Sequence, residues 1–250
     1  MIGLEGPEDP KERGGRFAGM ARVIGGLYRE EGDAWRRHYR KYFKRAARAL
    51  GLGFVAGFIY FVLRPTQEQR AVAFVVKSLK DIAPLHGSRF TLAVTLFYHN
   101  ARASVVAILA GVVPFLFLPI VDPFMNGAVL GLLSSVSKHH GLNVPLLIVT
   151  QILPHGVFEL TAVLYATSVG LYLSAAMGRK AVAAWRRRKS RRRGPTRDPN
   201  ATGFLEAYPA MPEEVDENLA GNVIRAFALV VLPLLLVAAF IESFITPLLG

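Results

Sequence analysis

The sequence contains no cysteine, which excludes a small secreted domain held together by disulfides. It also lacks a glycine-rich dinucleotide turn, a P-loop, a paired-cysteine metal cluster and a nucleophile elbow. We therefore expect no cofactor and no resident metal. Long stretches carry almost no charge although the net charge is +12, because the basic residues gather in short runs. This block pattern is typical of a membrane protein with several spans and makes a soluble nucleic-acid-binding protein a poor fit.

The apolar content supports the same class: 52% of the 250 residues are hydrophobic and the mean hydropathy is +0.33. Residues 1–45 are glycine-rich and basic, lack the apolar core of a signal peptide, and are expected to form a cytoplasmic amino-terminal segment. Within them begins Trp35–Arg48, a basic stretch with interleaved aromatic residues that predicts an amphipathic helix at the membrane surface. Ala46–Leu63 is long and apolar enough for a first span.

Residues 46–178 are expected to form the membrane domain. Within it, residues 66–98 place apolar and charged side chains on opposite sides of a helix, which predicts an external amphipathic segment. Ala103–Val121 is predicted as the second span and Met125–Ser137 as a short third span. The histidines that follow, His139 and His140, are expected in a solvated turn.

Val144–Met177 contains no positive charge and, as one straight helix, would measure about 51 Å, well beyond the hydrocarbon thickness. We therefore predict a break at Pro154–Gly156, because proline removes a backbone donor and glycine permits a sharp bend. Val144–Leu153 then becomes a half-helix or re-entrant arm, and Val157–Met177 becomes a full span.

Residues 179–221 form a basic and then acidic loop, and residues 222–250 supply the last span. Most of the 30 lysines and arginines fall on one side of the membrane if five spans begin with the amino terminus inside. The sequence therefore predicts an all-α, multi-pass protein of the plasma membrane with a cytoplasmic amino terminus.

A dense basic block lies in the predicted cytoplasmic loop, where it acts as a topology determinant and is also expected to attract anionic lipid. Its residues are Arg186, Arg187, Arg188, Lys189, Arg191, Arg192 and Arg193. The position beside a span explains this charge without any nucleic-acid partner. Further expected partners are other membrane or cell-envelope proteins, including further copies of this chain.

Polar residues inside the apolar segments are the candidates for a functional site. His155 and Glu159 lie one helical turn apart, and Glu242, Asn100 and Asn126 lie in or beside other spans, from where they are able to converge on that pair. Three interpretations stay open for the pair: a hydrogen-bonded device that pins the kink, a proton or substrate pocket, or half of a metal site. Two ligands fall short of the three usual for catalytic zinc, and no residue is assigned a catalytic role.

Four stretches of the chain resemble the stage II sporulation protein M family of multi-pass membrane proteins: Phe97–Ala103, Asn126–Gly131, Ile152–Leu160 and Phe240–Pro247. The resemblance covers about residues 90–250. It implies a membrane component that works, in spore-forming bacteria, with peptidoglycan-degrading partners during engulfment. It implies no catalytic residues.

From these observations we expect a non-enzymatic membrane scaffold, or a subunit that recruits partners, in an assembly that remodels the cell envelope. One alternative is a transporter-like permease subunit with a polar site at His155 and Glu159. The other is an intramembrane hydrolase that uses the same pair together with Glu242. A water-accessible cavity at His155 would favour transport, a third metal ligand would favour hydrolysis, and a closed bundle would favour the scaffold.

Overall fold

The computed structural model describes residues 10–82, 88–143, 146, 153–193 and 218–248, and in this part of the chain it contains helices and no strand. The α-helices are α1 (Pro10–Ala34), α2 (Arg40–Leu63), α3 (Pro65–Ile82), α4 (Arg89–Ala110), α5 (Val121–His139), α7 (Leu153–Arg193), α8 (Leu219–Ala226) and α9 (Leu232–Phe240). Short π-helical segments η1 (Trp35–Tyr39), η4 (Phe227–Val231) and η5 (Ile241–Ile245) continue α1, α8 and α9, and 3-10 turns η2 (Leu118–Ile120) and η6 (Thr246–Leu248) complete the described elements.

Five helical segments are long and apolar enough to cross a membrane: Gly19–Leu63, Arg89–Ala110, Leu118–His139, Leu153–Arg186 and Leu219–Ile245. The predicted class, an all-α membrane protein with five spans, is therefore confirmed. The re-entrant arm predicted over Val144–Leu153 falls almost wholly outside the described residues.

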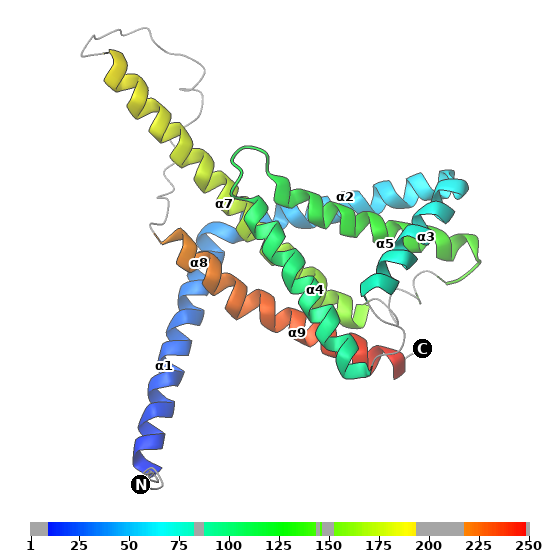
Figure 1. Cartoon of the computed structure of the whole chain (residues 1–250), viewed down its shortest axis with the longest axis horizontal. Coiled ribbons are helices and arrows are strands. Elements are labelled where there is room, and N and C mark those ends of the chain that lie inside the picture. Colours follow the sequence, from blue (N-terminus) through cyan, green and yellow to red (C-terminus); the bar gives the residue numbers. More distant parts are fainter. Residues whose placement is uncertain (1–9, 83–87, 144–145, 147–152, 194–217, 249–250) are drawn as a thin grey trace, which may run out of the picture.

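Helix α7 lies at the centre of the bundle, with α4 and α9 beside it (Figure 1). Its small and aromatic side chains are fully buried at Ala162, Ala166, Val169 and Tyr172. A Cβ atom added to Gly111, at the end of α4, would overlap the carbonyl oxygen of Gly170 in α7. Only glycine at these positions lets two backbones approach so closely, as is common between membrane helices.

Helices α2 and α5 form a second closely packed pair. Cβ atoms added to Gly53 or Gly127 would overlap the carbonyl oxygens of Phe124 and Leu50, respectively. Gly127 therefore lies in direct backbone contact with α2. Four residues further along both helices, Gly57 lies against Ala128. The contacts therefore advance together, and α2 and α5 run in the same direction.

The helix directions agree with five alternating passes. Gly111 lies against Gly170, and Asn100 bonds to Glu159, so α4 and α7 also run parallel. Helix α9 runs opposite to both (Figure 1). The first and third spans thus share one direction, the second and fourth share a direction, and the fifth reverses the fourth, as alternation requires.

The second span begins earlier than the apolar run Ala103–Val121 indicates. Helix α4 starts at Arg89, because the Ser88 hydroxyl caps it by accepting a hydrogen bond from the Thr91 backbone N–H at 3.2 Å. It ends at Ala110, before the prolines. The external segment predicted over residues 66–98 is therefore divided between α3 and the first half of α4.

The basic, aromatic segment from Trp35 onward is amphipathic, as predicted, and its aromatic side packs against α7. Tyr39 and Tyr42 are buried, and Trp35 stacks on Tyr165 with ring centroids 5.3 Å apart. The seven lysines and arginines at positions 36–48 are all exposed. The aromatic residues thus fix the start of the first span to the central helix.

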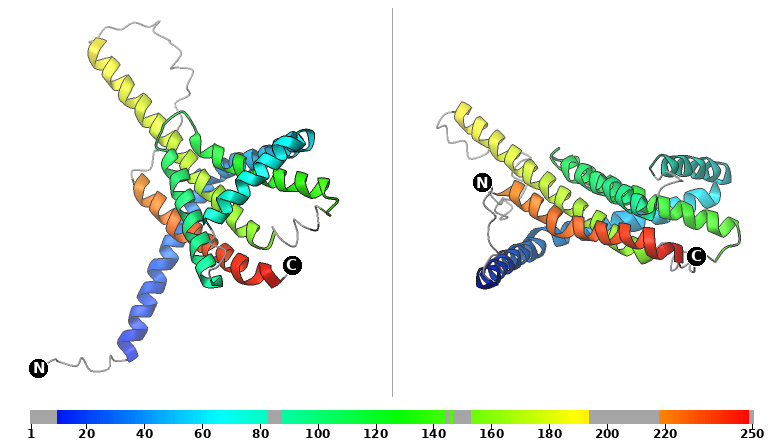
Figure 2. Two further views of the ribbon diagram at one scale, coloured as in Figure 1. Left: turned by 45° about the vertical axis from the view of Figure 1, so that its right-hand side comes forward. Right: turned by 60° about the horizontal axis from the view of Figure 1, so that its bottom comes forward.

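An ion-pair network joins the end of α1 to α7 and α8. Arg225 donates hydrogen bonds to Glu31 at 3.0 Å and to Glu30 at 2.9 Å, and the Tyr165 hydroxyl donates to Glu31 at 2.6 Å. The Glu31 side chain is only 4% exposed. Beyond this network α1 points away from the bundle, as does the far end of α7 (Figures 1 and 2).

Candidate functional site

Four of the five polar residues singled out in the membrane segments meet at one end of the bundle. His155 and Glu159 lie on the first two turns of α7, and Glu242 reaches them from η5. The possible ligand atoms of these three side chains all lie within 4.8 Å of one another. The Asn100 side-chain amide, on α4, donates a hydrogen bond to Glu159 Oε1 at 3.0 Å. All four residues are half-buried.

The local sequence explains how α7 places His155 and Glu159. Pro154 lies in the first turn, where its missing N–H would have no helical partner and its fixed φ suits the helix. The predicted break does not fall at His155 or Gly156, because α7 runs through both residues without interruption, and His155 and Glu159 therefore share one face. The parallel packing of α4 on α7 places Asn100 opposite that face.

Asn126 lies elsewhere. Its side-chain amide donates within its own helix, to the Asp122 carbonyl oxygen at 3.0 Å and to Asp122 Oδ1 at 3.3 Å. The neighbouring Gly127 faces α2. The convergence expected for Asn126 is therefore wrong in this structure: its amide satisfies the first turn of α5.

The cluster combines an imidazole, two carboxylates and an amide inside membrane-spanning helices. Ionised carboxylates in such a setting are costly, and two of them close together also repel each other. The structure partners one carboxylate oxygen, Glu159 Oε1, with the Asn100 amide. The arrangement is able to hold protons shared between its groups, or a cation.

A second polar cluster lies at the carboxy-terminal end of α5, and the sequence did not predict it. His139 Nδ1 lies 3.0 Å from the Glu68 carboxylate of α3, and the Ser135 hydroxyl donates a hydrogen bond to the same carboxylate. His139 is the exposed last residue of α5 and His140 follows it in the turn, which agrees with the solvated position expected for the two histidines, and the His139 imidazole also contacts the Glu68 carboxylate. The sequence signal was the spacing of Ser135 and His139, which puts both on one helix face, but their partner lies far away in the chain.

The electrostatics of Glu68 follow from this contact. Burial alone would raise the pKa of the Glu68 carboxyl, but the hydrogen bonds from Ser135 and His139 and the nearby histidine charges together lower that pKa below its usual value. Glu68 is therefore a carboxylate at neutral pH, and it ties α3 to the end of α5.

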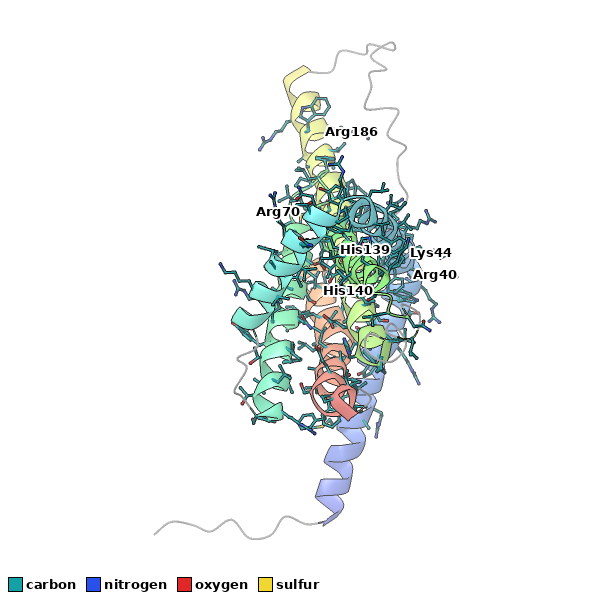
Figure 3. The ribbon with its side chains drawn as sticks, turned by 90° about the vertical axis from the view of Figure 1, so that its right-hand side faces the viewer. Arg40, Lys44, Arg70, His139, His140 and Arg186 are labelled. Carbon is teal, nitrogen blue, oxygen red and sulfur yellow. The ribbon has the colours of Figure 1, made fainter. Side chains whose placement is uncertain are left out.

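The basic block lies on the extension of α7, because the helix continues past Met177 to Arg193. Figure 3 shows Arg186 on the part of α7 that rises beyond the rest of the bundle. The backbone of the whole block is helical, so the cytoplasmic loop predicted from residue 179 begins as a helix. The side chains of Arg187, Lys189 and residues 191–193 lie outside the described part.

The family model of stage II sporulation protein M matches residues 46–247. The chain belongs to this family. No curated protein and no solved structure is detectably similar to it. The match includes all four residues of the polar cluster and both glycine-mediated helix contacts, so the stage II sporulation protein M region is the five-helix membrane bundle, and α1 lies before it.

Proposed function

We propose that this member of the stage II sporulation protein M family is a non-enzymatic membrane scaffold that recruits a partner protein in an envelope-remodelling assembly. The proposal includes a cytoplasmic amino terminus, supported by the concentration of basic residues at positions 36–48 and 179–197. The main support for the scaffold role is an exposed apolar face on helix α1.

Helix α1 exposes a row of large apolar side chains. Met20, Val23, Ile24 and Leu27 are 61%, 64%, 44% and 37% exposed, and their spacing places them on one face of the helix. About two turns further along the same face, Ala34 is buried in the bundle. The row therefore continues a packing face beyond the point where the bundle covers it, and such uncovered apolar surface is typical of an interaction site.

An apolar helix of a partner protein fits this row of exposed side chains. Helices that lie on anionic lipid carry a polar face rich in lysine and arginine. From Gly19 to Ala34, by contrast, α1 has two arginines and three acidic residues. An amphipathic helix of mixed charge that projects from a fixed base is suited to helix-to-helix docking.

A photo-crosslinking amino acid at Val23, incorporated in the native cell, tests this role. We expect one reproducible adduct with a membrane or envelope protein, and we expect Leu27→Glu to abolish it while the unfolding temperature stays unchanged. The same crosslinker at Ala21, on a different face of α1, is the matched control. Adducts with lipid alone, or equal adducts from Val23 and Ala21, would contradict the proposal.

The intramembrane hydrolase is a second candidate, favoured by the third donor that Glu242 adds to the pair on α7. The variant Glu159→Gln separates it from the scaffold, because the amide keeps most hydrogen bonding but removes the charge. Under the scaffold proposal, the variant complements a deletion strain and remains folded. A variant that is folded but inactive in cells would favour catalysis.

We also propose that the basic end of α7 binds anionic lipid. Each basic residue near an anionic surface contributes about 1 kcal/mol, and salt screens the attraction. A peptide of residues 179–200 should bind phosphatidylserine vesicles more weakly after four arginines are neutralised, and more weakly in high salt. Binding that follows a nucleic-acid sequence instead would refute this.

A further inference from the structure

We propose that His155, Glu159 and Glu242 form a binding site for one divalent transition-metal ion of the Zn²⁺ class. This inference is independent of the scaffold role, because the three residues lie at the end of the bundle formed by α4, α7 and η5, whereas the docking row lies on α1. The two proposals therefore fail or survive separately.

The donor geometry supports the site. Metal–ligand bonds of about 2.0 to 2.2 Å place the donors of one tetrahedral site roughly 3.3 to 3.6 Å apart. The ligand atoms here already lie within 4.8 Å of one another. Because each of the three side chains is only half-buried and has rotatable bonds, small rotamer changes close the remaining gap.

The environment of the His155 imidazole is a second observation that supports a metal site. His155 Nδ1 is buried and has no hydrogen-bond partner in the part of the chain that the structure describes. Buried polar atoms are rarely left without a partner, and an imidazole nitrogen beside two carboxylates is a common metal ligand. A bound cation would satisfy the imidazole and also remove the repulsion between Glu159 and Glu242.

The surroundings of the cluster resemble those of known metal sites. Ligating carboxylates are usually held by a hydrogen bond from outside the ligand set. The Asn100 amide supplies such a bond to Glu159 Oε1, which leaves Oε2 for the ion. Glu242 lies in a π-helical segment, and such local widening of a helix is frequent at functional sites. Asn100 is therefore a positioning residue.

The kinds of ligand atom in the cluster indicate which metal ions it would bind. One nitrogen and two carboxylate oxygens suit Zn²⁺ or a neighbouring first-row metal better than Mg²⁺, which prefers six oxygen ligands. Three protein ligands leave a fourth position open. The ion would also connect the start of α7 to the end of the last span.

The test uses the full-length protein, purified in mild detergent, freed of any affinity tag, stripped with a chelator and then titrated with Zn²⁺ or Mg²⁺. We expect one equivalent of Zn²⁺ to remain after desalting, measured by elemental mass spectrometry, and an unfolding temperature several degrees higher with Zn²⁺ but not with Mg²⁺. Asn100→Ala should weaken Zn²⁺ binding by about 10- to 100-fold.

His155→Gln and Glu242→Gln should each abolish the retained equivalent and the Zn²⁺-dependent shift, while their metal-free unfolding temperatures show that they are folded. His139→Gln, which removes a histidine outside the cluster, is the matched control and should change neither result. Absence of retained Zn²⁺ in the parent protein, or retention that survives both cluster variants, would overturn the inference.

Discussion

Replacing Arg225 tests the network that fixes the base of α1. The variant Arg225→Met keeps the length of the side chain but removes the charge that pairs with Glu31, whose side chain is 4% exposed. Removing one partner of a buried ion pair costs about 3 to 5 kcal/mol, because the other charge stays buried without compensation. We expect a loss of unfolding free energy in this range.

The two acidic partners of Arg225 should contribute very unequally. Glu30 is 62% exposed, so its pair with Arg225 is screened by solvent and Glu30→Gln should cost no more than about 1 kcal/mol. Tyr165→Phe leaves one Glu31 oxygen without its hydroxyl donor and should cost about 1 to 3 kcal/mol. The order of destabilisation is thus Arg225, then Tyr165, then Glu30.

Thermal unfolding in mild detergent measures these differences. For a protein of this size, about 1 kcal/mol corresponds to about 2 to 4 °C, so Arg225→Met should lower the unfolding temperature by roughly 6 to 20 °C. Combining it with Glu31→Met removes both charges and should recover most of the loss. The reasoning is refuted if the double variant is as unstable as Arg225→Met, or if Glu30→Gln alone is equally destabilising.

Three further predictions concern topology, packing and pH. In intact cells, a cysteine at Ser88 should react with a membrane-impermeant maleimide and one at Ser190 should not; labelling of both would contradict the proposed orientation. Gly127→Leu should separate α2 from α5 and lower the unfolding temperature by several degrees, since overpacking costs about 1 to 3 kcal/mol, whereas Gly51→Leu, which meets open space, should not. Because the pKa of Glu68 is lowered on folding, its carboxylate stabilises the protein above the ordinary glutamate pKa of about 4.3, and this contribution is lost as the pH falls through the lowered value. The stability difference between the parent and Glu68→Gln should therefore be largest near pH 7 and shrink in acid, and a difference that grows in acid would be inconsistent with it.

The class, the number of spans and the pairing of His155 with Glu159 follow from patterns within short stretches of sequence. Hydropathy identifies apolar segments, and a spacing of four puts two side chains on one helix face. The approach of Glu242 depends instead on how α9 crosses α7, which no local pattern specifies. The same is true of Glu31 and Arg225, which meet across most of the chain.

The helix boundaries were predicted less well, for a physical reason. A hydropathy run marks where a helix is apolar, whereas capping and proline mark where it starts and stops. The Ser88 cap begins α4 before the apolar run, and α7 continues through its arginines because arginine and lysine are good helix formers. The edge of an apolar segment is therefore not the end of a helix.

Helix α7 is a single element of 41 residues, about 62 Å long, with the polar cluster on its first turns and the arginines on its last. If α7 tilts as a rigid rod, its two ends move in opposite directions. A tilt of about 10° about its middle displaces each end by about 5 Å, more than the spread of the ligand atoms around His155. A rigid tilt that brought the arginine end closer to a lipid surface would therefore also shift His155 and Glu159 relative to Asn100 and Glu242.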